Sequence, residues 1–592
     1  MSTRALRIAL FLFWVGAAGT YLGTAAKQKQ NLNLSATAGG QYPYLINAQR
    51  MATEGVTQYL GDRNRMPLYP ALLSAVYVED WDTFVRRSAW FSIVSSMLML
   101  LGVGWIAYRH LPLGPATAFT VVATFCVFRD RASFVQAELL YFTLLFASWL
   151  LLCRLLRKPA IPRGIGAGVL VAAAYLTKAS ALAMLPIYLV TAGALLLVAG
   201  WSRGRSAKPS AAPLARSRLV TSVVVALAFL AVVFPYIKEN KARFDHYFYN
   251  VNSSFFLWTD GWAQAKDFAD RHRASETYPS APPSEIPGPM NYWKTHTFQQ
   301  IGHRLYAGLQ TVGSLAQARP SFKYLAIILA FCVLLGVGQR WRLRSLGPEN
   351  WSIVGFSLLL GVSYIVVYSW YAQVAYGDRF VLSLALPALF AALWLASDLS
   401  KRTEPFALFG RRFSKVDGLA AALLLAGLVE TVVFVAGPDA AASPEFVRFY
   451  YNESHERLLA GDHVEAAKGL HGVVTLDPSF APAHRALGNL ALSAGRFDHA
   501  VGYLTDAVRL DPRSADAHNS LGSALRQLGR TQAASERYLE AIRISPDFAA
   551  AWYNLGEAFW ELGAMEEAYR VRERLETLDP ALARRLPAAM AQ

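Results

Sequence analysis

Apolar segments that are long enough, or nearly long enough, to cross a bilayer recur along the first 436 residues of this 592-residue chain. A helix of about 20 apolar residues spans the hydrocarbon core and satisfies its own backbone hydrogen bonds there. The candidate segments are 5–24, 88–108, 115–128, 137–156, 164–178, 180–200, 219–237, 321–338, 351–371, 379–397 and 417–436. The sequence therefore predicts an all-α fold in which residues 1–436 form a polytopic membrane domain of about eleven transmembrane helices. Segments 115–128 and 164–178 are short for a span, so the count is open at these two.

The basic residues between these segments indicate how the chain is oriented. The net charge is +16, and all of the positive excess precedes residue 444. Four connections are rich in Lys and Arg, namely 154–163, 203–218, 340–344 and 401–415. With eleven spans these connections share the side of the N-terminus, and the positive-inside rule makes that side cytoplasmic. We expect a multi-pass protein of a bacterial inner membrane whose loops 25–87 and 238–320, and everything after about 437, are extracytoplasmic.

Two functional classes are disfavoured by composition. Most of the basic excess lies beside apolar segments, where topology and lipid headgroups explain it, so we expect contacts with membrane lipids and no nucleic-acid partner. Cys126, Cys153 and Cys332 all lie within apolar segments. Neither a disulfide framework nor a thiolate metal site is therefore indicated.

A 34-residue repeat occupies residues 437–592. Its markers are Leu487-Gly488, Leu521-Gly522 and Leu555-Gly556; Gly461, Gly495, Gly529 and Gly563; Ala466, Ala500, Ala534 and Ala568; and Pro478, Pro512, Pro546 and Pro580. The register resembles the tetratricopeptide repeat, which is a pair of antiparallel helices that stacks into an α-solenoid. The expected repeats are about 445–478, 481–512, 515–546 and 549–580, and the first lacks the Leu-Gly pair and is interpreted as a cap. Such a solenoid presents a concave surface for a protein partner.

His484 and His518 could be mistaken for metal ligands in this domain. They occupy the repeat position that Trp552 occupies in the third full repeat. Two histidines one whole repeat apart are too far from each other to share a metal ion, so we interpret them as packing residues.

The polar residues of the expected outer side are the candidates for chemistry. Asp62 and Arg65 precede a short helix bounded by Pro67 and Pro70, which is either a headgroup-level segment or a pocket wall in which Arg65 faces a phosphate. Asp130 follows one apolar segment, and Glu138 begins the next. Glu138 is either a favourable charge at a helix N-terminus or a general acid-base group in a partly dry site.

Three further charged residues lie at span ends on the same side. Lys178 lies between two short apolar segments, where it either reaches lipid headgroups or holds a phosphate. Asp378 and Arg379 lie at the start of segment 379–397 and form either a local ion pair or part of a site. The aromatic residues of loop 238–320 suit both carbohydrate faces and membrane interfaces.

Taken in order, the stretches QYPYLINAQRM, DRNRMPLYPALL, VQAELLYF, AAAYLTKAS, FPYIKEN and YGDRFVLSLALP resemble the polytopic glycosyltransferases that use polyprenyl-phosphate sugars. That superfamily includes the protein O-mannosyltransferases and the lipid A aminoarabinose transferases. With its C-terminal repeats, the chain also resembles the transmembrane-and-repeat mannosyltransferases of eukaryotes. The resemblance implies a lipid-linked sugar as donor substrate, bound at the outer mouth of the spans, and a protein or glycan acceptor from the extracytoplasmic side.

The chain departs from this family at its first outer loop. The family has Asp-Glu-x-x-Tyr or Asp-Gln-x-x-Tyr there, whereas this chain has Gly40-Gln41-Tyr42-Pro43-Tyr44. Neither glycine nor glutamine can remove a proton. Three explanations remain: another carboxylate acts as base, the acceptor needs little base catalysis, or the site is inactive.

The resulting hypothesis is glycosyl transfer with Asp130 or Glu138 as base and Asp62 as a further catalytic candidate. Lys178 and Arg379 would stabilise the departing phosphate, and the predicted substrate-binding set is Lys178, Arg379, Arg65, Tyr44 and Asp378. No cofactor is implied with certainty, and a divalent metal ion is compatible with Asp62 and Asp130, although no metal motif is present. Two rival hypotheses are an inactive, membrane-anchored repeat scaffold for envelope assembly and a transporter or lipid flippase.

Overall fold

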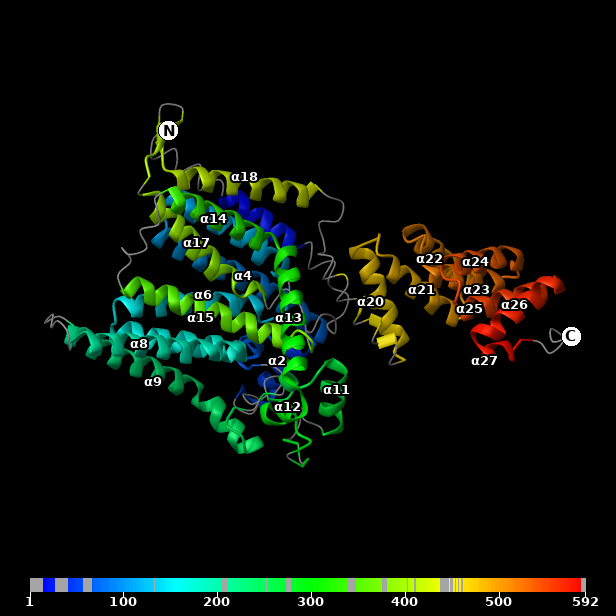
Figure 1. The fold of residues 1–592 in the computed structure, drawn as a ribbon, viewed down its shortest axis with the longest axis horizontal. Coiled ribbons are helices and arrows are strands. Elements are labelled where there is room, and N and C mark those ends of the chain that lie inside the picture. The colour runs from blue at the N-terminus through cyan, green and yellow to red at the C-terminus, as the bar shows by residue number, and fades with distance from the viewer. Residues whose placement is uncertain are drawn as a thin grey trace. The chain divides into compact units, whose positions relative to one another are not determined.

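A computed structural model describes most of the chain as two compact units, one ending at Gly437 and the other beginning at Pro438 (Figure 1). The described residues are 14–26, 41–56, 66–132, 134–203, 211–248, 250, 254–272, 278–279, 281–282, 284–338, 348–374, 381–401, 403–408, 411–436, 447, 451–452, 454–455, 457–458 and 461–586. Both units are helical. The first contains one short hairpin of strands, β1 (Phe406–Leu408) and β2 (Arg411–Phe413), paired antiparallel.

The first unit is a bundle of long helices with shorter helices at one end. After a helix over 14–26, its elements are α2 (Tyr42–Glu54), α3 (Leu68–Ser74), α4 (Trp81–His110), α5 (Leu113–Ala123), η3 (Thr124–Phe128), η4 (Arg129–Arg131), α6 (Glu138–Arg157), α7 (Ile161–Thr177), η5 (Ala179–Ala183), α8 (Met184–Arg203), α9 (Ala211–Phe244), η6 (Phe256–Trp258), α11 (Trp262–Arg271), α12 (Pro289–Thr295), α13 (Phe298–Ala318), α14 (Pro320–Gly338), α15 (Pro348–Tyr371), α17 (Ala385–Ser400) and α18 (Lys415–Ala436). Its core contains many aromatic side chains, among them Phe119, Phe146, Trp149 and Phe390.

Five helices in the described residues are long and apolar enough to cross a membrane: Thr83–His110, Glu138–Arg157, Ala179–Val198, Pro213–Phe244 and Trp351–Tyr371. A sixth results if α13 and α14, which meet at 88°, are counted together. Three further apolar helices are shorter, Leu113–Phe128, Ile161–Thr177 and Ala385–Ser400. The predicted count of eleven is therefore not reached in the described residues, and part of segment 5–24 lies outside them.

Close helix contacts fix the relative directions of the helices. Gly168 of α7 lies so close to α9 that an added Cβ would be 2.4 Å from the carbonyl oxygen of Val225, and Gly164 meets Thr221 one turn earlier, so α7 and α9 run parallel. Helices α6 and α15 run antiparallel, because Tyr141 bonds Tyr364 whereas Trp149 bonds Ser357. The directions of these four helices agree with the predicted alternation.

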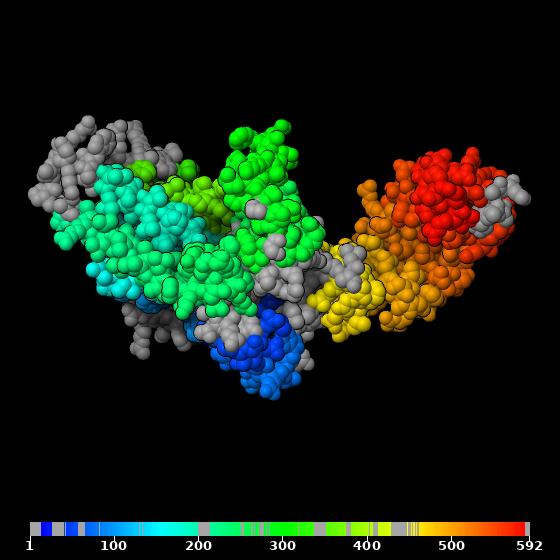
Figure 2. Space-filling model, turned by 90° about the horizontal axis from the view of Figure 1, so that it is seen from below, coloured from blue at the N-terminus to red at the C-terminus, as the bar shows by residue number. Residues whose placement is uncertain are grey.

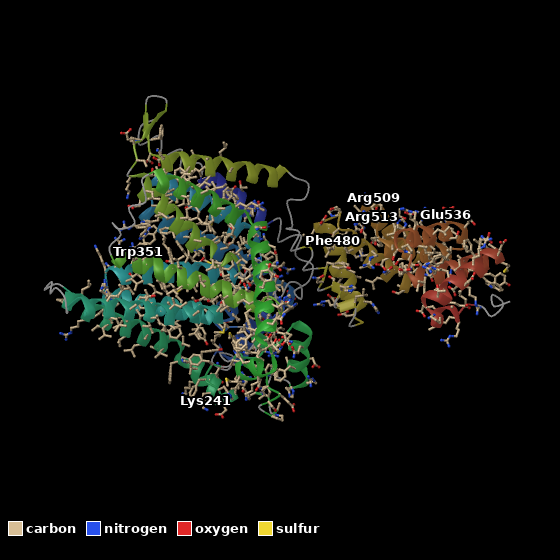
Figure 3. The ribbon with its side chains drawn as sticks, in the orientation of Figure 1. Lys241, Trp351, Phe480, Arg509, Arg513 and Glu536 are labelled. Carbon is tan, nitrogen blue, oxygen red and sulfur yellow. The ribbon has the colours of Figure 1, made fainter. Side chains whose placement is uncertain are left out.

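Basic residues gather at the end of the bundle where α4 and α6 finish. Arg154 of α6 contacts His110 of α4, and Arg218 of α9 donates to the carbonyl of Leu156 at 3.4 Å. Trp351 marks the same end of α15, whereas Lys241 lies near the far end of α9 (Figure 3). Glu138 begins α6, which is 20 residues long, so about 28 Å along the helix axis separate it from Arg157.

The second unit is a stack of helix pairs, drawn in orange and red in Figures 1 and 2. Its helices are α20 (His463–Leu476), α21 (Ala481–Ser493), α22 (Phe497–Leu510), α23 (Ala515–Gln527), α24 (Thr531–Ile544), α25 (Ala549–Glu561), α26 (Met565–Leu578) and α27 (Pro580–Ala583). The repeated glycines end the turns with positive φ, which is 72° at Gly495 and Gly529. Within one helix pair, the Tyr538 ring packs closely on Gly522, since a Cβ added to this glycine would lie 2.6 Å from the ring.

Candidate functional site

The two predicted site residues that the structure brings together are Glu138 and Lys178. Helices α6 and α7 are consecutive and antiparallel, so the first residue of α6 lies beside the residue that caps the end of α7. Lys178 Nζ donates to Glu138 Oε1 at 3.0 Å, with the Glu138 side chain 3% exposed and that of Lys178 20% exposed. An acidic group at a helix N-terminus and a basic group at a C-terminus are each favoured by the helix dipole. The pair therefore places a favourable charge at each of the two helix ends and leaves the Lys178 ammonium partly exposed.

Hydroxyl groups extend the site away from this pair into the bundle. Tyr141, one turn after Glu138, has its ring 5.7 Å from Lys178 Nζ, within the range of a cation–π contact. Its hydroxyl shares a hydrogen bond with Ser180 at 2.9 Å and donates to Tyr364 at 3.2 Å. Tyr368 and Ser383, 3.3 Å apart, continue the row. Segments distant in sequence thus contribute hydroxyls to one polar row beside Lys178.

Residues of the segment 25–87 contact the same region. Tyr69 of α3 is buried, and its hydroxyl is 2.8 Å from Ser92. Burial raises the pKa of Tyr69 well above its ordinary value, and the negative charge of Glu138 contributes in the same direction. Tyr44, predicted to bind substrate, is buried and packs edge-to-face on the Tyr69 ring at 5.4 Å. Tyr69, with Tyr44 packed on it, therefore lies near Glu138.

Gln41 has a structural role that sequence reasoning missed. Its side-chain oxygen accepts a 2.8 Å hydrogen bond from the backbone N–H of Val135, just before α6. A neutral amide can do this because its oxygen is a hydrogen-bond acceptor, as a carboxylate oxygen is. The residue next to the family's acidic position thus ties the first loop to the segment that leads into Glu138. Gly40 lies outside the described residues.

The remaining predicted residues are not placed. Asp62 and Arg65 lie outside the described residues, as do Asp378 and Arg379. Asp130 belongs to η4 by its backbone, but its side chain is outside the described part. Among the described residues, no three His, Cys, Asp or Glu side chains gather as a metal ion would require.

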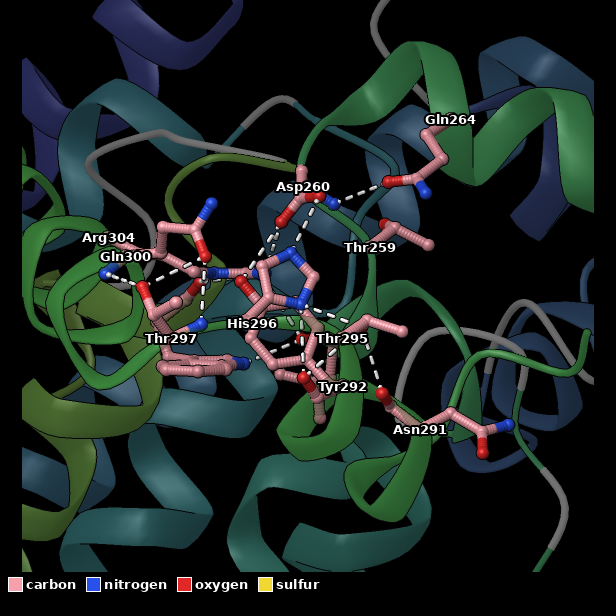
Figure 4. A network of polar contacts seen from close by, with 12 residues as sticks. Thr259, Asp260, Gln264, Asn291, Tyr292, Thr295, His296, Thr297, Gln300 and Arg304 are labelled. Carbon is pink, nitrogen blue, oxygen red and sulfur yellow. Dashed lines mark hydrogen bonds and ion pairs between the residues drawn. The ribbon is translucent and has the colours of Figure 1, made fainter. Parts of the chain in front are cut away.

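A polar network in the segment 238–320 was not predicted (Figure 4). Asp260 accepts one hydrogen bond from the Tyr292 hydroxyl at 2.9 Å and lies 3.1 Å from His296 Nε2. The His296 ring stacks on that of Tyr292 at 3.8 Å, and Nδ1 lies 3.0 Å from the Tyr292 carbonyl. Both ring nitrogens thus have partners within the loop, so the arrangement favours a structural role for His296 over proton transfer.

Arg304 of α13 joins this network to the end of α15. Its guanidinium, 5% exposed, lies 3.6 Å from Asp260 and donates to the carbonyls of Trp370 and Leu257 at 3.1 and 3.2 Å. It also lies 4.5 Å from the centre of the Trp370 ring. Burial of the Tyr292 hydroxyl raises its pKa despite the neighbouring Arg304. We call these contacts of Arg304 with Asp260, Leu257 and Trp370 the Arg304 clasp. The sequence contained no spacing signal for it, because its members come from separate segments.

The repeat unit confirms the packing interpretation of its histidines. Nε2 of His484 lies 2.9 Å from the carbonyl of Pro478, and Nε2 of His518 lies 3.2 Å from that of Pro512. In the next repeat Trp552 Nε1 donates to the carbonyl of Pro546 at 2.8 Å. In these repeats, one ring nitrogen therefore lies against the carbonyl of the proline in the turn that precedes its own helix.

Comparison with known proteins identifies the repeats. The tetratricopeptide-repeat pattern matches residues 483–516 and 549–582, and a TPR-repeat pattern matches 522–563. The C-terminal unit therefore carries tetratricopeptide repeats. Curated proteins give no match.

Solved structures similar to the chain include MamA, which is 27% identical over 23% of this chain and 73% of MamA, with a TM-score of 0.22. A mutant O-GlcNAc transferase of Thermobaculum terrenum is 23% identical over 24% of this chain and 27% of its own, with a TM-score of 0.22. PilF of Pseudomonas aeruginosa is 24% identical over 24% of this chain and 64% of its own, also at 0.22. At these scores no function follows from the likeness.

Proposed function

We propose that the first unit spans a membrane, with the Glu138–Lys178 pair on the outer side. Three of the long helices carry stripes of large apolar side chains that are exposed: Trp90, Val94, Leu98, Leu101 and Trp105 on α4; Leu219, Val223, Leu227, Leu230 and Phe234 on α9; and Trp351, Val354, Leu358, Val362 and Ile365 on α15. Helical spacing places each set on one face. Such continuous apolar surface is unfavourable in water and is what lipid tails would cover. The basic residues at the opposite end fit the cytoplasmic side.

At the outer end we propose transfer of a sugar from a polyprenyl-phosphate donor to an extracytoplasmic acceptor. The observation that carries the proposal is the buried Glu138 carboxylate bound to the partly exposed Lys178 ammonium. Because Glu138 is the more buried member, it holds Lys178 in place, and Lys178 presents its charge to the donor phosphate. This assigns Glu138 a positioning role and leaves Asp130 as the proposed base.

In the proposed reaction the acceptor oxygen attacks the anomeric carbon of the sugar. The bond from that carbon to the phosphate oxygen breaks, and polyprenyl phosphate leaves with one more negative charge. The acceptor proton passes to Asp130. Lys178 then stabilises charge that exists only as the bond breaks, which is the condition for accelerating the reaction.

The test is mass spectrometry of envelope glycans and glycoproteins from hosts that carry the intact chain, a deletion, Lys178→Met or Lys241→Met. Lys241 is a matched control because it also forms an ion pair, with Asp245, but at an exposed site. We expect one glycan species to disappear in the deletion and in Lys178→Met but not in Lys241→Met, with equal protein in the membrane. The Glu138→Gln/Lys178→Met double variant guards against loss through misfolding. Full glycosylation in both Lys178 variants would refute the proposal.

A second candidate function is a protein-binding scaffold, and the tetratricopeptide repeats favour it. Solenoids of this kind bind proteins through their concave surface. In the combined account, the repeats hold the acceptor or a partner protein near the transferase site and raise its local concentration. If truncation after Gly437 abolishes the phenotype while Lys178→Met leaves it intact, the scaffold alone is the function.

A further inference from the structure

Helices α12 and α13 carry an apolar surface that other parts of the first unit leave exposed. The exposed fractions are 68% for Met290, 52% for Trp293, 84% for Phe298, 60% for Tyr306 and 41% for Leu309. Trp293 and Phe298 lie against each other with ring centres 6.0 Å apart, so the two helices share one patch. Three of the five are aromatic, the residue type that is enriched where membrane meets water.

Helix α13 has three distinct faces. Arg304 and Gly308 point toward the bundle and are buried. At 100° per residue, Phe298, Leu309 and Tyr306 fall within one exposed arc about 80° wide. The polar residues Gln299, His303, Gln310 and Ser314 form the adjacent exposed arc. A helix with one face on protein, one apolar face and one polar face fits a boundary between lipid and water.

The position of α13 in the bundle supports this boundary. An added Cβ on Gly308 would lie 1.8 Å from the carbonyl oxygen of Ser369, so α13 crosses α15 near the end of that candidate span. Arg304 bonds the next carbonyl, that of Trp370. Helix α13 meets the apolar α14 at 88°, and Figure 1 shows it running across the general direction of α8, α14 and α15. If α15 crosses the membrane, α13 lies in the plane of the membrane at its outer surface.

We propose that α12 and α13 form an in-plane anchor whose apolar patch inserts into the outer lipid leaflet at the headgroup level. The proposal rests on the membrane-spanning part of the proposed function. The occupant is lipid because the patch lies at the end of the same spans whose exposed apolar stripes require lipid, and because its aromatic residues suit the headgroup region. The Arg304 clasp fixes the anchor to α15, which contributes Tyr364 and Tyr368 to the site. The anchor thereby holds the site at the depth of a lipid phosphate.

The test measures depth in the membrane with nitroxide labels on the full chain in nanodiscs of phosphatidylcholine and phosphatidylglycerol. The labels are placed at Leu309→Cys and Gln310→Cys, which are neighbours on different arcs of α13. Leu98→Cys reports a span, and Arg513→Cys, in an exposed turn of the repeats (Figure 3), reports water. The parent chain gives the background labelling, because Cys126, Cys153 and Cys332 are buried. Collisions with oxygen report lipid, and collisions with a nickel chelate report water.

We expect the oxygen-to-nickel collision ratio at position 309 to exceed that at 310 several-fold and to lie between the ratios at 98 and 513. Phe298→Cys and Gln299→Cys should reproduce the contrast at the start of α13. A water-like ratio at 309 with a lipid-like ratio at 98 would overturn the anchor and leave the spans intact. Loss of collisions with both reagents at 309 would mean that protein covers the patch, which also overturns it. A water-like ratio at 98 would overturn the spans, and the anchor with them.

Discussion

Removing Lys178 takes away the ammonium that lies 3.0 Å from the buried Glu138 carboxylate, and this makes a sharp prediction about stability. In Lys178→Met, the Glu138 carboxyl, with only 3% of its side chain exposed, loses this ion pair. Breaking a buried pair in this way typically costs about 3–5 kcal/mol. The reverse change, Glu138→Gln, leaves an ammonium that is 20% exposed and can be hydrated, so we expect a smaller loss of about 2–3 kcal/mol.

The double variant Glu138→Gln/Lys178→Met contains no buried charge at this position. We expect it to lie within about 2 kcal/mol of the parent, and therefore above Lys178→Met in stability. The assay is unfolding by SDS in mixed micelles, which gives a free energy for each of the four proteins at pH 7. Additive losses, with the double variant the least stable, would refute the coupling and the positioning role of Glu138.

Three further predictions follow from packing and capping. Gly308→Ala should destabilise the first unit by about 3 kcal/mol in the same SDS assay, because the new Cβ would clash with a backbone oxygen. In the control Gly313→Ala, the new Cβ has nothing within 4 Å, so we expect a gain in stability of up to about 1 kcal/mol. Gly522→Ala should cost the repeat unit about 1–3 kcal/mol through its clash with Tyr538, whereas Gly502→Ala should not, as measured by hydrogen exchange of the full chain in urea. Hydrogen bonds from Thr83 hold the pKa of Asp80 below its ordinary value of 3.8. The Asp80 cap of α4 is therefore complete above about pH 4 and is lost as the pH falls through the lowered pKa. Protection of the Thr83 amide from hydrogen exchange should fall over the same pH range in the parent chain, and should not fall in Asp80→Asn. Equal behaviour of either glycine pair, or a pH-independent Thr83 amide in the parent, would contradict the corresponding prediction.

The repeat unit was predictable from the sequence because each of its signals is local. Glycine, alanine and proline recur every 34 residues, and the structure shows what each does. Gly495 and its equivalents adopt positive φ, and Ala500 and its equivalents are fully buried. Pro478, Pro512 and Pro546 each follow the C-cap residue of a helix. Even the equivalence of His518 with Trp552 could be predicted from the 34-residue register, and each bonds the carbonyl of the corresponding proline, Pro512 or Pro546.

The candidate site was predictable residue by residue but not as an arrangement. Glu138 and Lys178 are conspicuous because each is a charged residue set among apolar ones, yet 40 positions separate them. Only the antiparallel packing of α6 on α7 brings them to 3.0 Å. The Arg304 clasp had no comparable signal, because Asp260, His296 and Arg304 lie in a polar, aromatic loop where none of them is unusual.

The count of spans was less predictable than the direction of the helices. Apolar composition does not separate a lipid-facing span from a short helix buried among others. The segment 115–128 illustrates this, because it divides into α5 and the π-helical turn η3, and its residues from Pro115 to Phe128 are all buried. Helix direction depends only on the up-and-down alternation of consecutive helices. A short helix such as α7 therefore still has the predicted direction, even though it is too short for an ordinary span.

The most direct test of the account is donor consumption by the purified full chain in nanodiscs. The protein would be given a panel of polyprenyl-phosphate hexoses and pentoses labelled in the sugar, and release of polyprenyl phosphate would be measured. The account predicts that at least one donor is consumed, that Lys178→Met lowers the rate about 100-fold or more, and that Lys241→Met leaves it unchanged. Consumption of no donor by the parent chain, or an undiminished rate in Lys178→Met, would contradict it.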